Sequence, residues 1–141
     1  ITICTKDKQN VFWEKYVGED IILPPDTNNV NVPLSDYGKI VDKAINAISS
    51  IYDSAEVLRY VIMPNHVHII LLISNGRMVS SPTSISTIIG QMKRYSSKEI
   101  GKPIWQRSFH DHIVRGEKDY MKIAEYIDTN ILTWEKDCFY E

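Results

Sequence analysis

The chain has 141 residues and a mass of 16.3 kDa, and its 43% hydrophobic and 24% charged content is typical of one globular domain. No apolar run approaches the about 18 residues that a membrane-spanning helix needs, which excludes a helical membrane protein. Cys4 and Cys138 are too few for a disulfide scaffold or a cysteine-based zinc site, so we expect a cytoplasmic protein. Because the chain begins with Ile1 rather than Met, we expect a processed or incomplete N-terminus.

The charge of the chain is unevenly distributed. The net charge of −2 argues against nucleic acid as a partner. Residues 87–115, however, contain six basic and two acidic residues and carry +4, whereas residues 116–141 contain three basic and seven acidic residues and carry −4. A basic surface on an acidic protein is therefore one reading of residues 87–115, and ordinary solvated lysines on a helix are the other.

The first elements follow from local patterns. Residues 1–5 alternate between apolar and polar and predict a strand. Residues 18–34 are rich in Asn, Pro and Asp and predict a loop or small hairpin. Ser35 is a candidate N-cap for a helix, because apolar residues recur at helical spacing from Ile40 to Ile51.

A hairpin is predicted next. Residues 57–63 are rich in β-branched and aromatic residues and predict a strand, and residues 66–73 predict a second one. Pro64 and Asn65 between them have the conformational preferences of a turn. Residues 74–84, which are mainly Ser, Asn, Gly and Pro, predict a loop.

Two further helices and a strand complete the predicted elements. Ser84 or Ser86 begins a helix that Gly101 ends. Residues 104–114 predict a strand, and residues 116–130 predict a helix with acidic residues in its first turn.

The order β, α, β, β, α, β, α predicts an α+β fold of the ferredoxin-like (RRM-like) type. We expect a four-stranded antiparallel sheet with helices on one face and an additional C-terminal helix. Residues 1–141 are predicted to form a single domain, with residues 135–141 as a tail.

All four histidines occur in pairs separated by one residue: His66 with His68, and His110 with His112. Side chains two residues apart on a strand share a face, so each pair could chelate a metal. The first pair begins an apolar strand, where a low dielectric strengthens a metal bond, whereas Asp111 separates the second pair. An HxH pair alone is more often explained by packing and surface histidines.

A metal site needs a third ligand, and no recognised zinc motif such as HExxH supplies one here. Tyr126 and Asn130 are four residues apart on the last predicted helix and therefore share one of its faces. They could point at one site together. The alternative is that Tyr126 lies at the edge of the core and that Asn130 caps the helix.

Three segments carry a resemblance to a known family: YVIMPNHVH at residues 60–68, WQRSFHDH at 105–112 and EYIDTN at 125–130. Together they strongly resemble the single-tyrosine HUH transposases of the IS200 type, and REP-associated tyrosine transposases in particular. The order and spacing of these segments match from about Asp36 to Trp134. The combination is specific, although each segment alone is not.

The resemblance implies roles for four residues. His66 and His68 match the HUH histidines, which bind one divalent cation together with a helix residue that Asn130 matches. Tyr126 matches the nucleophile. The resemblance implies Mg²⁺ or Mn²⁺ as the cation, because the ligand types alone would also suit zinc or nickel.

The chain departs from this family at two positions. Ile131 stands where many relatives have Pro, which alters how the helix ends. Asp128 stands where many have His, and its charge would either repel phosphate or reinforce the metal site.

The chemistry of these residue types agrees with the implied roles. A tyrosine hydroxyl has a pKa of about 10 and needs a nearby metal or base to act as a nucleophile. Two imidazoles and an amide are neutral and would leave the charge of a cation available to a phosphate. Attack on DNA would produce a 5′-phosphotyrosyl intermediate and a 3′-hydroxyl, which could reverse the step without ATP. Tyr120 lies about 240° from Tyr126 around a helix, so it is expected in the core rather than at the same site.

The expected partner is single-stranded or hairpin DNA. Basic side chains could contact phosphates, and aromatic rings could stack on unpaired bases, although Trp105 and Phe109 share strand parity and are candidates for the core. The candidates are Lys93, Arg94, Lys98, Arg107 and Arg115 for phosphates, Trp105, Phe109 and Tyr95 for bases, and His110 and His112 for DNA contact or support of the site.

The leading hypothesis is a metal-dependent DNA transesterase of the bacterial cytoplasm, associated with the nucleoid when bound to DNA. One alternative is a nucleic-acid-binding relative that does not cut. Another is a different metal or phosphodiester enzyme, but two-histidine phosphoesterases need Thr or Ser where this chain has His68 and His112. No membrane partner is expected, and the resemblance leaves both a monomer and a homodimer open.

Overall fold

A computed structural model of the chain describes residues 1–13, 34–74 and 84–136. The loops predicted at residues 18–34 and 74–84 and the tail predicted at 135–141 lie mostly outside these ranges. Among the described residues, no helix combines the length and hydropathy needed to cross a membrane. The elements in chain order are β1 (Thr2–Cys4), the 3-10 helix η1 (Lys6–Lys8), α1 (Asp36–Ile51), β2 (Ala55–Ile62), β3 (His66–Ile73), α2 (Ile85–Ile100), α3 (Glu117–Thr129) and the 3-10 helix η2 (Ile131–Lys136).

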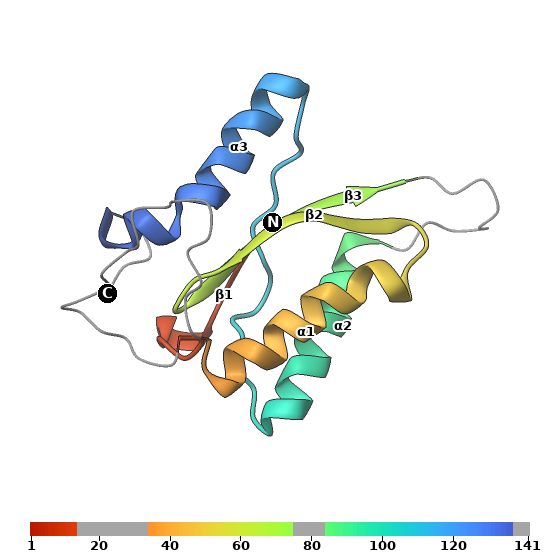
Figure 1. The fold of residues 1–141 in the computed structure, drawn as a ribbon. Coiled ribbons are helices and arrows are strands. Elements are labelled where there is room, and N and C mark those ends of the chain that lie inside the picture. Colours follow the sequence, from red (N-terminus) through yellow and green to blue (C-terminus); the bar gives the residue numbers. More distant parts are fainter. Residues whose placement is uncertain (14–33, 75–83, 137–141) are drawn as a thin grey trace.

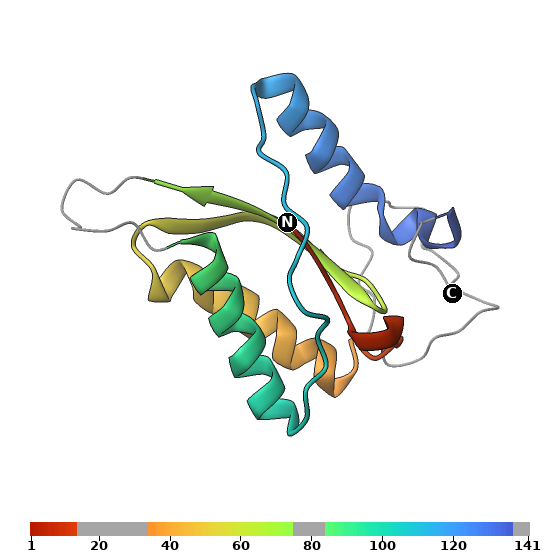
Figure 2. The same cartoon turned by 180° about the vertical axis from the view of Figure 1, so that it is seen from behind.

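The three strands form an antiparallel sheet in the order β1-β3-β2. β3 is central, and its register places Thr2 of β1 opposite His68 and Cys4 opposite His66. Helices α1 and α2 lie against one face of this sheet, and α3 lies over the other face (Figure 1). The same arrangement is visible from behind (Figure 2). The mixed architecture and the antiparallel hairpin agree with the predicted fold.

The prediction of a fourth strand at residues 104–114 is wrong. This segment runs alongside β1, but only two isolated bridges join them, Thr5 with Trp105 and Thr2 with His110. Between these bridges the segment has two more residues than β1, and Ser108 adopts a left-handed φ of 65°. Extra residues on one side of a ladder interrupt its hydrogen bonding. The described sheet therefore has three strands and an irregular edge.

The helix boundaries follow the predicted caps. The Ser35 hydroxyl accepts a hydrogen bond from the Gly38 N–H at 3.1 Å, and Ser84 rather than Ser86 caps α2 by accepting one from the Thr87 N–H at 3.2 Å. Gly101 ends α2 in the left-handed conformation, with φ of 92°. Each cap satisfies a backbone group that the first or last turn leaves without a partner, which explains why these ends could be predicted.

Alternation along β3 directs successive side chains to the two faces of the sheet. Val67 and Ile69 are buried and belong to the hydrophobic core with Ile45 of α1 and Ile88 of α2. Successive side chains of a strand face opposite sides of the sheet. The even-numbered residues of β3 therefore face α3, and His68 is among them.

Candidate functional site

The turn at Pro64 and Asn65 delivers two histidines to the start of β3, where both are buried. Their Nε2 atoms lie 3.1 Å apart, and their rings meet edge to face with centroids 4.7 Å apart. The opposite ring nitrogens have partners of their own. His66 Nδ1 lies 2.7 Å from the Asn65 side-chain oxygen, and His68 Nδ1 lies 2.9 Å from the hydroxyl of Thr2 on β1.

Burial determines the protonation of the first histidine. His66 has no exposed surface, and desolvation lowers its pKa to about 4. A neutral imidazole is the form that binds metals, so His66 is in its ligand form at neutral pH.

Helix α3 brings a tyrosine to the second histidine. The rings of Tyr126 and His68 meet edge to face with centroids 5.3 Å apart. Tyr126 is 45% exposed, so a substrate can reach this residue. The structure therefore places the predicted nucleophile beside one of the predicted metal ligands.

Asn130 follows Tyr126 by one helical turn and is the C-cap residue of α3. Its backbone conformation is still helical, so it shares the Tyr126 face of the helix. The side chain is 1% exposed, and neither its oxygen nor its nitrogen has a hydrogen-bond partner in the described part of the chain. A buried amide without a partner is costly, and it is the type of group that a bound ligand satisfies.

These residues fit a divalent cation. The described residues contain no cluster of three His, Cys, Asp or Glu side chains that could hold a metal, so a site at the histidine pair needs another ligand type. Two ligands at about 2.1 Å from one octahedral ion lie about 3.0 Å apart, close to the observed separation of the two Nε2 atoms. An amide oxygen such as that of Asn130 is a ligand type that these cations accept.

A pocket of about 910 Å³ lies between the sheet and α3. His68 and Tyr126 both line it, together with His112 and Asp119 near the start of α3. Much of its remaining wall is aliphatic, with exposed side chains such as Leu72. The pocket is large enough to admit part of a polymeric substrate beside the tyrosine.

The second histidine pair does not act as a chelating pair in the described structure. His112 Nε2 lies 2.9 Å from a carboxylate oxygen of Asp119, and the same oxygen accepts a hydrogen bond from the Arg115 N–H. The backbone hydrogen bond from Arg115 contributes most, and that with His112 next, to lowering the pKa of the Asp119 carboxyl. His110 is exposed, and its backbone pairs with Thr2.

Asp128, the acid that departs from the family pattern, forms an ion pair with an arginine. Arg59 Nη1, on β2, lies 2.8 and 2.6 Å from the two carboxylate oxygens of Asp128. Hydrogen bonds with Tyr120 and then with Asp128 raise the pKa of Arg59. Sequence reasoning missed Arg59, although an arginine among the apolar and aromatic residues 57–63 was a signal. Tyr120 packs against the core, as predicted, but it also lines the same pocket as Tyr126, which was not predicted.

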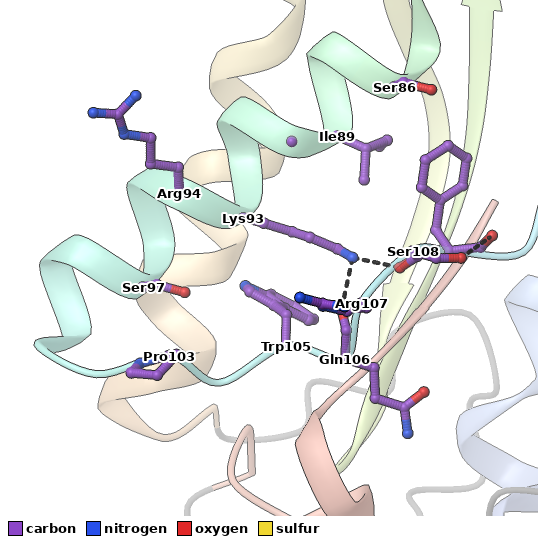
Figure 3. A pocket seen from close by; sticks show the side chains of 12 residues that line it. Ser86, Ile89, Lys93, Arg94, Ser97, Pro103, Trp105, Gln106, Arg107 and Ser108 are labelled. Atoms are coloured by element: carbon purple, nitrogen blue, oxygen red, sulfur yellow. Dashed lines mark hydrogen bonds between the residues drawn. The ribbon is translucent and has the colours of Figure 1, made fainter.

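A basic groove lies between α2 and residues 103–109 (Figure 3). Its volume is about 440 Å³, and Arg94 and Arg107 line it. Lys93 crosses it and donates hydrogen bonds to the Gln106 carbonyl at 2.9 Å and to the Ser108 carbonyl (Figure 3). Burial lowers the pKa of Lys93. Lys93 thus holds the irregular edge against α2, whereas the other predicted basic contacts are exposed: Arg94, Lys98, Arg107 and Arg115.

The predicted stacking role of Trp105 is not supported. Its side chain is 9% exposed, its ring packs against Phe12 with centroids 5.3 Å apart, and its Nε1–H donates to the Ser96 hydroxyl at 2.8 Å. Trp105 is therefore a core residue. Phe109 is more exposed than Trp105, and Tyr95 is 40% exposed.

Comparisons with known proteins identify relatives of this chain. No family model matches the sequence. An uncharacterized protein of Haemophilus influenzae is 30% identical over 99% of this chain and 83% of its own length. A solved structure of a REP-associated tyrosine transposase bound to a REP hairpin is 26% identical, with a TM-score of 0.59, and the match covers 68% of this chain. This chain spans 55% of the length of that transposase. The chain belongs to the same family as the Haemophilus influenzae protein, and its fold is similar to that of a REP-associated tyrosine transposase.

Proposed function

We propose that this protein is a metal-dependent transesterase that cuts and rejoins single-stranded DNA through Tyr126. The observation that carries the proposal is the contact between the Tyr126 ring and His68 inside a substrate-sized pocket. The similarity of the fold to a REP-associated tyrosine transposase supports the same reaction class.

Three side chains would hold the cation. His66 and His68 present Nε2 atoms 3.1 Å apart, and Asn130 offers a buried amide without a hydrogen-bond partner. Bound Mg²⁺ or Mn²⁺ would supply a Lewis acid that neutralises the scissile phosphate. Because all three side chains are neutral, the charge of the cation remains available to the phosphate.

The reaction is a phosphodiester exchange. The Tyr126 oxygen forms a bond to phosphorus, and the bond from phosphorus to the 3′-oxygen of the preceding nucleotide breaks. The phenolic proton leaves to solvent or a base, and the 3′-oxygen takes up a proton. The product is a 5′-phosphotyrosyl bond, which the same or another 3′-hydroxyl can attack. Strand transfer therefore needs no further source of energy.

The proposed substrate is hairpin-forming single-stranded DNA, which the nucleoid of a bacterial cell would provide. The similar solved transposase is bound to a REP hairpin. In this chain the exposed basic side chains are suited to phosphates, and they include Arg94, Lys98, Arg107 and Arg115. Either a monomer or a homodimer could carry out the reaction, because Tyr126 and His68 meet within one chain.

Covalent capture of DNA tests the proposal. End-labelled hairpin oligonucleotides incubated with the protein and Mn²⁺ should give a protein–DNA adduct on a denaturing gel, with the protein on the 5′ side of the break. Tyr126→Phe should reduce adduct formation by at least about 100-fold, since it removes the nucleophile but leaves the ring. EDTA should have the same effect. Tyr37→Phe, on α1 across the sheet, is the matched control and should not change the yield.

Two outcomes would contradict the proposal. An adduct that persists in Tyr126→Phe would place the nucleophile elsewhere. Tight hairpin binding by the wild-type protein without any adduct, across several hairpins, would instead support the relative that binds DNA but does not cut it.

A further inference from the structure

The two buried histidines have different kinds of hydrogen-bond partner at Nδ1. His66 Nδ1 lies 2.7 Å from the side-chain oxygen of Asn65. An amide oxygen only accepts hydrogen bonds, so His66 carries its proton on Nδ1 and directs the Nε2 lone pair at His68. The tautomer of His66 is thus determined by Asn65.

His68 has a partner that can change its role. Its Nδ1 lies 2.9 Å from the Thr2 hydroxyl, and a hydroxyl can either donate or accept. The tautomer of His68 is therefore not determined by Thr2. It depends on what lies between the two Nε2 atoms, which are 3.1 Å apart.

The metal-free site and the metal-bound site require different tautomers of His68. Without a cation, two facing lone pairs would repel each other, so His68 carries a proton on Nε2 and donates it to His66, and the Thr2 hydroxyl donates to Nδ1. With a cation, both Nε2 lone pairs are needed as ligands. The His68 proton must then be on Nδ1, where the Thr2 oxygen accepts it.

We propose that Thr2 is a positioning residue that allows His68 to change tautomer when a divalent cation binds. The inference depends on the metal site in the proposed function, but not on DNA cleavage. The total number of protons does not change, because one proton leaves Nε2 and one is gained at Nδ1.

The backbone around Thr2 suits this role. Thr2 lies opposite His68 in the register of β1 and β3. On its other side, Thr2 and His110 exchange backbone hydrogen bonds of 2.7 and 2.9 Å. Thr2 is therefore held between two neighbouring segments, and its hydroxyl can rotate while its backbone stays in place.

Nitrogen-15 NMR of the imidazoles tests the tautomer change directly, with Zn²⁺ as a diamagnetic probe. In the metal-free protein, His68 should be protonated on Nε2 and His66 on Nδ1. In the Zn²⁺-loaded protein, both should be protonated on Nδ1. A His68 ring that keeps one tautomer throughout the titration overturns the inference.

Calorimetry of Mn²⁺ binding tests the role of the hydroxyl without DNA. Thr2→Val removes the hydroxyl but keeps the branched shape, and it should weaken binding by about 10- to 100-fold. Thr2→Ser keeps the hydroxyl and should bind nearly as the wild type does. Wild-type affinity in Thr2→Val overturns the inference, provided that its amide spectrum is that of a folded protein. If Thr2→Val does not fold, the NMR titration of the wild type decides alone.

A normal tautomer change in a protein that forms no DNA adduct would refute the proposed function and leave this inference intact.

Discussion

His66 has a protonation equilibrium that depends on folding. In the folded chain it is fully buried and its pKa is about 4. In the unfolded chain its pKa returns to about 6.5. The unfolded state therefore binds a proton that the folded state rejects. The resulting stabilisation is complete above the unfolded pKa and is lost as the pH falls toward the folded pKa.

We predict that lowering the pH from 7 to 4 in EDTA decreases the free energy of unfolding by about 3 kcal/mol through this residue. Urea denaturation at a series of pH values measures the decrease. Carboxylates contribute to the same slope, so the wild type is compared with His66→Gln, which should lose correspondingly less stability over this range. Equal pH dependence in both proteins would show that His66 does not carry the effect.

At single positions, the placement of a residue was predictable where a local sequence pattern fixed it. The spacing of His66 and His68 indicated a shared face, and the two Nε2 atoms are 3.1 Å apart. The partner of Asp128 was not predictable, because Arg59 lies 69 residues away in the sequence. The burial of Trp105 was also not predictable from the sequence, because it depends on Phe12 and Ser96 from other parts of the fold.

Among the elements, α3 carries the proposed nucleophile, and Arg59 with Asp128 ties this helix to β2. Both side chains are about half exposed, so water screens the pair and its effect on global stability is small. Its position matters more, because Asp128 is two residues from Tyr126. The pair holds the end of the helix at which the tyrosine meets His68.

We predict that Asp128→Asn increases local opening of α3 by up to about fivefold, while the midpoint of global unfolding changes little. Amide hydrogen exchange of residues 117–129 measures the opening. The exchanged pair, Arg59→Asp with Asp128→Arg, should restore protection, because it reverses both charges and keeps their attraction. Unchanged exchange in Asp128→Asn would mean that apolar contacts alone anchor the helix.

The start of α1 depends on a close backbone approach at Gly38. A Cβ atom at this position would lie 2.2 Å from the Phe12 carbonyl oxygen. Gly90 on α2 is the matched helical position, because a Cβ atom there would have nothing within 4 Å.

We therefore predict opposite effects for the same substitution. Gly38→Ala should decrease the free energy of unfolding by about 1–3 kcal/mol, because the backbone at Phe12 must move. Gly90→Ala should increase it by up to about 1 kcal/mol through helix propensity. Chemical denaturation of both variants measures the difference, and a neutral Gly38→Ala would contradict the close approach.

In the molecule as a whole, the two faces of the sheet have different surroundings. Helices α1 and α2 cover one face and α3 lies over the other (Figure 2). Apolar residues of all three helices belong to the core, whereas the pocket that His68 and Tyr126 line lies toward α3. A cation on the α3 face would join β3 to α3 through His68 and Asn130. Binding there would therefore stabilise the folded molecule and not only the site.

We predict that Mn²⁺ at about 100 times its dissociation constant raises the free energy of unfolding by about 2.7 kcal/mol. Thermal unfolding with and without Mn²⁺ measures the gain. His68→Gln should abolish it, whereas His110→Gln, which alters an exposed histidine, should retain it. A gain of the same size in His68→Gln would place the cation elsewhere.

The sequence alone determined the features that depend on neighbours within a few residues. Ser35, Ser84 and Gly101 mark helix ends because each satisfies backbone groups in its own turn. The hairpin of β2 and β3 follows from the short turn at Pro64 and Asn65.

Tertiary structure alone decided the features that depend on distant neighbours. Residues 104–114 have the composition of a strand, but whether they form one depends on hydrogen bonds to β1, about a hundred residues earlier, and the Ser108 conformation interrupts that ladder. Packing also decided that α3 lies across the sheet from α1 and α2, which places Tyr126 against His68. No local pattern contains this information, because it arises only when separate elements bury their apolar faces together.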